Sequence, residues 1–425
     1  MFRLLALVCF TAAVLSLPAL ANEPAAAGDS PLSGPPLKWW KGNLHTHSLW
    51  SDGDQFPEMI ADWYREHGYH FLALTDHNVL SDGIRWMKVK DVVARSDEGV
   101  LDRYLQRFGE HWVQTRGEKG TPDHQVRLKP LDEFRHLVEE RGRFMMMPAE
   151  EISDRAEGKP VHINATNIAE VLPPAGGATV RETMQNNLRM ILAHEKQHGR
   201  QVLPHINHPN FGYAITAEDL AAVTSEQFFE VYNGHPAVGH LGNDDHPSVE
   251  RIWDLANAIR RTNLNVPPLM GIATDDSHEY HGVPGSHPGR GWVMVRSRFL
   301  TPEHILSAIK RGDFYASSGV TLGEVRFDQA TGTLSIQIDA NDGATYRTEF
   351  IGTMIDEGQQ DERIGVTLKT VHGVSPTYQL TGKELYVRAV VTSSLPADDP
   401  SFEDQMRQAW TQPVGWRSEN EPSQP

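Results

Sequence analysis

The stretches that decide the fold are NLHTHS (43–48), ALTDH (73–77), MMMPAEE (145–151) and MGIATDDSH (270–278), in which His, Asp or Glu follow apolar residues. A fifth stretch, LPHINHP (203–209), has the same form with histidines only. Carboxylates and imidazoles are costly to bury unless a partner compensates them. Five repetitions of an apolar strand followed by a ligand-type residue therefore indicate one site that holds several metal ions.

Short apolar runs alternate with helical patterns over most of the chain. Strands are expected near residues 42–46, 70–75, 143–149, 160–166, 201–206, 227–233 and 268–274. Helical patterns in FPEMIADWYREHG and RETMQNNLRMILAHEKQHG, each ending near a glycine, predict crossover helices between several of them. This alternation predicts an α/β fold, and about seven units predict a distorted (β/α)7 TIM-like barrel. Barrel enzymes build their active sites at the C-terminal strand ends, where the polar clusters stand.

The first residues and the overall charge limit the possible functions. Residues 1–21 combine Arg3, an apolar core and small residues before Asn22, which predicts a signal peptide rather than a membrane anchor. The only cysteine, Cys9, lies in this segment, so no disulfide or thiolate ligand is expected in the exported chain. Secretion across the inner membrane, to a periplasm, is the expected localisation. The net charge of −17 disfavours a nucleic-acid partner, because such proteins use basic surfaces.

Composition predicts the domain organisation of the rest. Residues 22–40, rich in Ala, Pro and Gly, are expected to form a flexible linker, and residues 41–320 the metal-binding barrel. A charged helical insertion is expected at 84–142, either as a lid or as a surface hairpin without a role. Alternating apolar and polar residues predict a small C-terminal β-sandwich-like domain over 321–417, followed by a disordered tail at 418–425.

Spacing selects the candidate ligands within the five stretches. His45 and His47 are two residues apart on an expected strand, so their side chains share one face. The same spacing pairs Asp276 with His278. The full set of candidate metal ligands is His45, His47, Asp52, His77, Glu151, His162, His208, Asp276 and His278. For His162, a buried structural histidine is the competing interpretation.

Four neighbouring residues have weaker signals. Glu150 alternates to the other strand face from Glu151 and is expected on the surface. Asp275 and His205 are expected behind the ligands rather than among them. Arg290, in the loop after the last ligand pair, is a candidate phosphate clamp, because a guanidinium group matches phosphate with two parallel hydrogen bonds. A surface arginine is the competing interpretation.

Taken in order, HTH, SDG, TDH, a Glu before Ile-Ser, His-Pro and DSH resemble the motif set of the PHP (polymerase and histidinol phosphatase) superfamily. The resemblance covers about 41–320, including LTPEHILSAIKRGDFYASSG (300–319), which is similar to the family's helix and strand after the last ligand. It implies a distorted (β/α)7 barrel that holds up to three divalent ions.

The resemblance also implies which residues share each ion. The three implied groups are His45, His47, Glu151 and Asp276; Glu151, His162 and His208; and Asp52, His77 and His278. Asp52 stands where some members of the family have His, which keeps a ligand but could alter the metal preference. Mixed His and carboxylate ligands without thiolate suit zinc, manganese or iron.

The expected function is that of a metal-dependent phosphoesterase acting on a small phosphate ester through a metal-bridged hydroxide. The candidate catalytic residues are Glu151, Asp276, His278 and Arg290. Two other functions are compatible with the sequence: hydrolysis of a non-phosphate ester or amide, and non-catalytic binding in the cell envelope with structural metals. Nine ligands exceed the four of a structural site, which weighs against the second. The sequence determines neither the substrate nor the oligomeric state.

Overall fold

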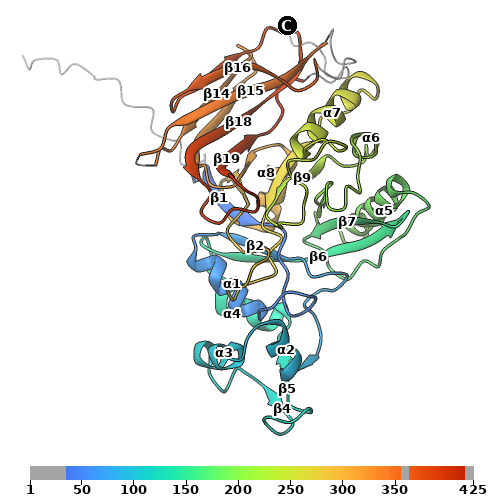
Figure 1. The fold of residues 1–425 in the computed structure, drawn as a ribbon, viewed down its shortest axis with the longest axis vertical. Helices are drawn as coiled ribbons and strands as arrows, with labels where there is room; N and C mark the ends of the chain where they lie inside the picture. Colours follow the sequence, from blue (N-terminus) through green and yellow to red (C-terminus); the bar gives the residue numbers. More distant parts are fainter. Residues whose placement is uncertain (1–34, 342, 356–362, 417–425) are drawn as a thin grey trace, which may run out of the picture. The chain divides into compact units, whose positions relative to one another are not determined.

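The computed structural model describes residues 35–341, 343–355 and 363–416 (Figure 1). The predicted signal peptide, most of the predicted linker and the predicted tail lie outside these ranges. In the part that is described, no helix is both long and apolar enough to span a membrane. The described residues from Leu37 onward belong to one compact unit.

The largest sheet has 13 strands. In spatial order they are β10 (Met270–Thr274), β9 (Phe228–Asn233), β8 (Leu203–Ile206), β7 (Lys159–Thr166), β6 (Met145–Ala156), β2 (Phe71–Leu74), β1 (Lys38–Asn43), β11 (Trp292–Ser297), β12 (Phe314–Ser317), β19 (Met406–Thr411), β18 (Glu384–Pro396), β15 (Tyr346–Met354) and β16 (Val366–His372). Strands therefore occur at all seven expected positions. β1 begins at Lys38, inside the expected linker, because residues 38–42 pair with β11.

Only part of this sheet has the parallel pairing expected of a (β/α)7 barrel. β1, β2 and β6 are parallel neighbours, as are β8, β9 and β10, but β7 runs antiparallel to both β6 and β8. The cause is a two-residue hairpin turn between β6 and β7 at Glu157 and Gly158, where φ is 54° and 77°. Positive φ at both residues is typical of a type I′ turn. The fold is mixed α/β, and the (β/α)7 barrel is not confirmed.

The helices of the described residues are α1 (Pro57–Glu66), α2 (Val89–Arg95), α3 (Val100–Phe108), α4 (Leu131–Val138), α5 (Val180–His198), α6 (Ala217–Ala221), α7 (Val249–Thr262) and α8 (Pro302–Lys310). α1 and α4 share an apolar cluster with β2 and the start of β6. α5 is preceded by Thr179, whose side chain accepts a hydrogen bond from the Glu182 amide, and is followed by Gly199 with φ of 57°. These are the start and stop signals that its sequence contains.

The insertion at 84–142, expected to be helical, also contains a small sheet. Its strands are β3 (Arg85–Lys88), β5 (Gln125–Leu128) and β4 (Thr115–Arg116), in that spatial order. The alternation in QVRL produces β5, which is too short to be separated from helix by its sequence alone. The insertion contacts the segment that carries Asp52, because Arg95 donates a hydrogen bond to the Ser51 carbonyl. It therefore supports one side of the candidate site.

The residues after 320 form two packed sheets. β13 (Leu322–Asp328), β14 (Thr333–Ile338) and β17 (Thr377–Gln379) form a three-stranded sheet, which shares an apolar cluster with β15 and β18. β15, β16, β18 and β19 continue the main sheet, because Ala316 of β12 pairs with Trp410 of β19. A buried ion pair between Arg388 and Asp254 joins β18 to α7 at 2.7 Å. The main sheet therefore runs through the boundary expected near residue 321.

Glu58 of α1 predicts a pH dependence of stability. Burial raises the pKa of this carboxyl to about 6, although hydrogen bonds from Tyr104 and Trp112 oppose the rise. The folded state thus binds the proton more tightly than the unfolded chain. The stabilisation is complete below about pH 4.5 and is lost as the pH rises through about 6, a change of about 2 kcal/mol. Replacing Glu58 by Gln should remove this component.

Urea denaturation of the metal-free protein between pH 4 and 7 measures this effect. As the pH rises from 4 to 7, the free energy of unfolding of the wild type should fall by about 2 kcal/mol relative to that of the Glu58→Gln variant. Glu66→Gln, an exposed position on the same helix, is the matched control and should run parallel to the wild type. Parallel curves for Glu58→Gln would contradict the expectation.

Candidate metal centre

Two isolated parallel bridges bring the polar segments together at the ends of the strands. One joins Thr46, after β1, to Ser277, after β10, and the other joins His77, after β2, to Glu151 of β6. As a result, the structure places all nine candidate ligands in one cluster of six imidazoles and three carboxylates. In this cluster, overlapping groups of three or four side chains have ligand atoms within 4.8 Å of one another.

The first group lies in the interior. The Nε2 atoms of His45 and His47 each lie 3.1 Å from the same Oδ1 atom of Asp276. Glu151 lies behind them, with its carboxylate oxygens 3.4 Å from His45 Nε2 and 3.5 Å from His47 Nε2. Both Nε2 atoms and Glu151 Oε2 are buried without a hydrogen-bond partner among the described residues. Buried polar atoms normally have a partner, so this convergence fits a shared cation.

Glu151 connects the first group to the rest of the cluster. Its Oε1 atom lies 3.0 Å from His162 Nδ1 and 3.4 Å from His208 Nε2, and its Oε2 atom lies 2.7 Å from His77 Nδ1. Asn207 donates a hydrogen bond to Oε1 at 2.7 Å. Burial alone would raise the pKa of Glu151, but the surrounding histidines hold it well below its usual range. The residue is therefore a buried anion, as a bridging carboxylate must be.

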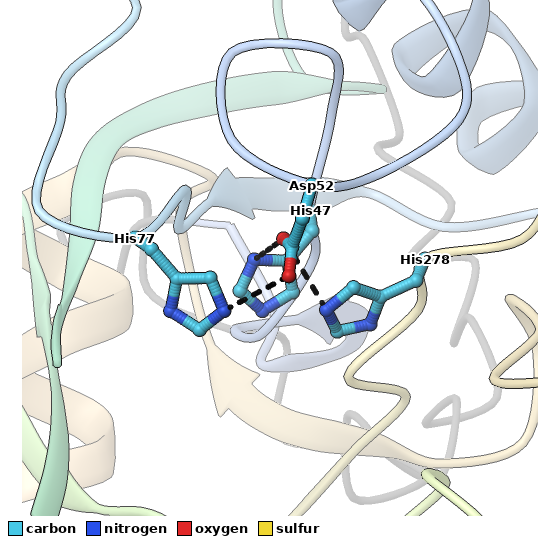
Figure 2. Close-up of side chains that lie close together, drawn as sticks. All are labelled: His47, Asp52, His77 and His278. Atoms are coloured by element: carbon cyan, nitrogen blue, oxygen red, sulfur yellow. Dashed lines mark ion pairs between the residues drawn. The ribbon is translucent and has the colours of Figure 1, made fainter. Parts of the chain in front are cut away.

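The third group surrounds Asp52, which faces His47, His77 and His278 (Figure 2). Asp52 lies 3.6 Å from His47 Nδ1, 3.4 Å from His77 Nε2 and 3.5 Å from His278 Nε2. The rings of His47 and His278 stack with their centroids 4.0 Å apart. The Asp52 side chain is 55% exposed, whereas that of Glu151 is 1% exposed. A substrate would therefore reach the cluster from the side of Asp52.

The donor set fits divalent transition metals. It contains imidazole nitrogens and carboxylate oxygens without a thiolate, which suits zinc, manganese or iron(II). Burial and the neighbouring His278 lower the pKa of His47 to about 3, whereas nearby carboxylates, acting against burial, raise the pKa of His45, His77, His208 and His278. The neutral ring is the form of histidine that binds a metal.

Glu230 in the middle of β9 belongs to the site but is missed by the sequence analysis. Its Oε1 atom lies 2.7 Å from His45 Nδ1 and accepts a hydrogen bond from Thr274, and its Oε2 atom accepts one from the His208 amide. A carboxylate on the far nitrogen of a ligand histidine fixes the ring orientation. His205 Nε2 lies 3.5 Å from the same Oε1 atom, so His45, His205 and Glu230 form a further group that could hold an ion, although His205 was expected behind the ligands. The available signal was a glutamate within the apolar run FFEVYN.

Two expectations about neighbouring carboxylates have different outcomes. Glu150 is fully buried rather than on the surface, because both faces of β6 are covered here and the Leu172 amide donates to its carboxylate. Burial raises the pKa of Glu150 to about 7. Asp275 lies behind the ligands, where it accepts hydrogen bonds from Asn43, Tyr64 and the Gly291 amide.

The structure does not bring Arg290 to the cluster. Its guanidinium donates to Asp399 at 3.0 and 3.1 Å, to the carbonyls of Gly234 and Gly285, and toward the His287 ring. All three guanidinium nitrogens are used in these contacts, so none is available to clamp a phosphate. The partner, Asp399, lies 109 residues further along the chain and could not be identified from the sequence.

The comparisons with known proteins match solved structures at low similarity. No protein-family model and no curated protein matches the sequence. A solved two-domain protein from Bacteroides vulgatus, which contains a predicted PHP-like metal-dependent phosphoesterase, is similar over 89% of this chain and 97% of its own, with 15% identity and a TM-score of 0.38.

Two further solved structures each cover 58% of this chain and 90% of their own. One is a provisionally assigned metal-dependent phosphoesterase from Bifidobacterium adolescentis, with 12% identity and a TM-score of 0.30. The other is an amidohydrolase from Chromobacterium violaceum with bound sulfate, with 14% identity and a TM-score of 0.28. No activity is inferred from similarities this low. These three solved proteins are thus two metal-dependent phosphoesterases, one predicted and one provisionally assigned, and one amidohydrolase.

Proposed function

We propose that the protein is a metal-dependent hydrolase that acts on small phosphate esters. The supporting observation is the convergence of His45 Nε2 and His47 Nε2 on one oxygen of Asp276, with both nitrogens buried and without a hydrogen-bond partner among the described residues. Glu151 links this group to the histidines beside it. Divalent ions bound here, up to three of zinc, manganese or iron(II), would activate water and neutralise charge on a phosphoryl group.

The chain's own residues would orient the reactants. Glu230 contacts His45 Nδ1, so His45 Nε2 is left to bind an ion in the proposed metal centre. Asn233 donates a hydrogen bond to Asp276 Oδ2 at 3.0 Å, which orients the other oxygen, Oδ1, toward His45 and His47. His278, beside the exposed Asp52, would contact the substrate. Arg290 has no part in this proposal, because its donors are already used.

Hydrolysis of chromogenic phosphate esters tests the proposed activity. Purified protein, with its metal content measured by elemental analysis, is assayed with a mono- and a diester of p-nitrophenol. Turnover should depend on added manganese, zinc or iron(II) and disappear with a chelator. Asp276→Asn should lower turnover by at least about 100-fold, because it removes the charge that faces both buried histidines. Its circular dichroism spectrum should match that of the wild type.

The same panel contains the outcomes that would overturn the proposal. Turnover of carboxylic esters or anilides without any phosphate ester would identify a different hydrolase. No turnover of any substrate, with ions confirmed bound, would favour a binding protein with structural metals. Glu66→Gln is the control variant, because it changes an exposed carboxylate on α1 and should leave turnover unchanged.

A further inference from the structure

His235 lies beside the metal cluster without belonging to any of the five ligand stretches. It follows β9 by two residues and is half-buried. Its ring centroid lies 5.6 Å from that of His278 and 6.0 Å from that of Phe211. Phe211 also contacts the ring of His208, with centroids 5.1 Å apart. His235 is therefore part of the wall around the ligands.

The position of His235 is fixed by the same side chain that holds a candidate ligand. Asn233 accepts a hydrogen bond from the His235 amide at 2.8 Å through Oδ1, and donates to Asp276 through Nδ2 at 3.0 Å. The backbone of His235 and the carboxylate of Asp276 are thus joined through one amide group. This link holds the backbone of His235 close to the carboxylate of Asp276.

The hydrogen bonding of the ring also fixes which nitrogen carries the proton. His235 Nδ1 accepts a hydrogen bond from the Ala237 amide at 3.1 Å. An accepting nitrogen is unprotonated, so in the neutral ring Nε2 carries the hydrogen and is a donor. No side chain or carbonyl among the described residues accepts a hydrogen bond from this Nε2 atom. His235 therefore has a donor without an acceptor in the described part of the chain, on a ring whose centroid lies 5.6 Å from that of the candidate ligand His278.

The charges around the cluster make such a neutral donor important. The ion pairs that the described residues form with Asp52, Glu151 and Asp276 involve histidines only, and Arg290 is turned away. A phosphoryl group would thus depend on neutral donors as well as on bound ions. We propose that His235 Nε2–H donates a hydrogen bond to a phosphoryl oxygen of the bound substrate. This inference rests on the proposed function, and it adds a substrate-binding residue that no ligand motif contains.

Binding of inorganic phosphate to the manganese-loaded protein tests this inference by titration calorimetry. His235→Leu removes the donor and should weaken phosphate binding roughly 10–100-fold, as expected for a hydrogen bond to a charged group. His235→Gln places an amide donor near the position of Nε2 and should retain most of the affinity. Manganese affinity, measured separately, should be the same in all three proteins, because His235 is not a ligand.

His246→Leu is the matched control. His246 lies in the same connection between β9 and α7, where it stacks on Tyr213 with ring centroids 4.0 Å apart, and its loss should not change phosphate binding. Equal phosphate affinity of the wild type and His235→Leu would overturn the inference and leave the phosphoesterase standing. Loss of manganese in His235→Leu would show a structural role and also overturn it. A wild type that binds manganese but no phosphate would overturn both proposals.

Discussion

Replacing Glu151 by glutamine is expected to abolish hydrolysis and to remove most of the bound metal. Five histidines surround this carboxylate at 2.7 to 3.5 Å, and the side chain is 1% exposed. Glutamine keeps the shape but removes the charge and replaces one ligand oxygen with an amide nitrogen that cannot bind a cation. Because Glu151 is itself a proposed ligand, metal affinity should fall by more than the roughly 10–100-fold typical of an outer partner.

Glu150→Gln is the matched control for this variant. The two glutamates are neighbours on β6 and both are buried, but Glu150 accepts from the Leu172 amide on the other face of the strand. Metal content by elemental analysis and turnover of a phosphate ester should stay near wild type in Glu150→Gln. Full metal occupancy in Glu151→Gln would contradict its role as the shared ligand. Equal losses in both variants would indicate a general packing defect.

Removing the carboxylate of Asp254 is expected to cause the largest loss of stability. Arg388 donates to both oxygens of Asp254 at 2.9 and 2.7 Å, and the two side chains are 1% and 4% exposed. Asp254→Ala leaves a buried guanidinium without its main partner. The free energy of unfolding should fall by about 3–5 kcal/mol, measured by urea denaturation of the metal-free protein.

Two further variants separate two causes of this loss of stability: the burial of an unpaired Arg388 charge and the loss of the contacts made by Asp254. Glu250→Ala removes a second, partly exposed partner of Arg388 at 3.1 Å and should cost much less. The double variant Asp254→Leu/Arg388→Met removes both charges and should recover part of the stability lost in Asp254→Ala. Equal losses of unfolding free energy in Asp254→Ala and Glu250→Ala would contradict a strong interaction between Arg388 and Asp254.

The sequence predicted the strand positions well because the signals are local. Each of the seven expected strands is a short apolar run, and a strand occurs at each of the seven positions. The order and direction of the strands depend on contacts between distant residues. The hairpin at Glu157 and Gly158 reverses β7 and breaks the βα alternation, and neither residue is marked by an Asn-Gly or Asp-Gly signature.

The residues of the candidate site were also predicted only in part. Motif spacing selected the nine side chains that the structure brings together, even though Glu151 and His162 lie within strands and Asp52 lies nine residues after β1. Glu230 was missed because no histidine stands beside it in FFEVYN, and the role of Arg290 was misjudged because its partner Asp399 is distant in the sequence. Glu150 was misjudged because alternation predicts a solvent face only where one side of the strand is open.

The pairing of β12 with β19 has a consequence for synthesis of the chain. Ser317 of β12 contacts Gln408 of β19, which lies 91 residues later. At the usual rate of translation, β12 would wait for about 5–20 s before its partner emerged. During that interval the backbone edge of a buried strand, FYAS, is open to other chains. Newly made protein should therefore depend on chaperones more strongly than the stability of the finished fold would suggest.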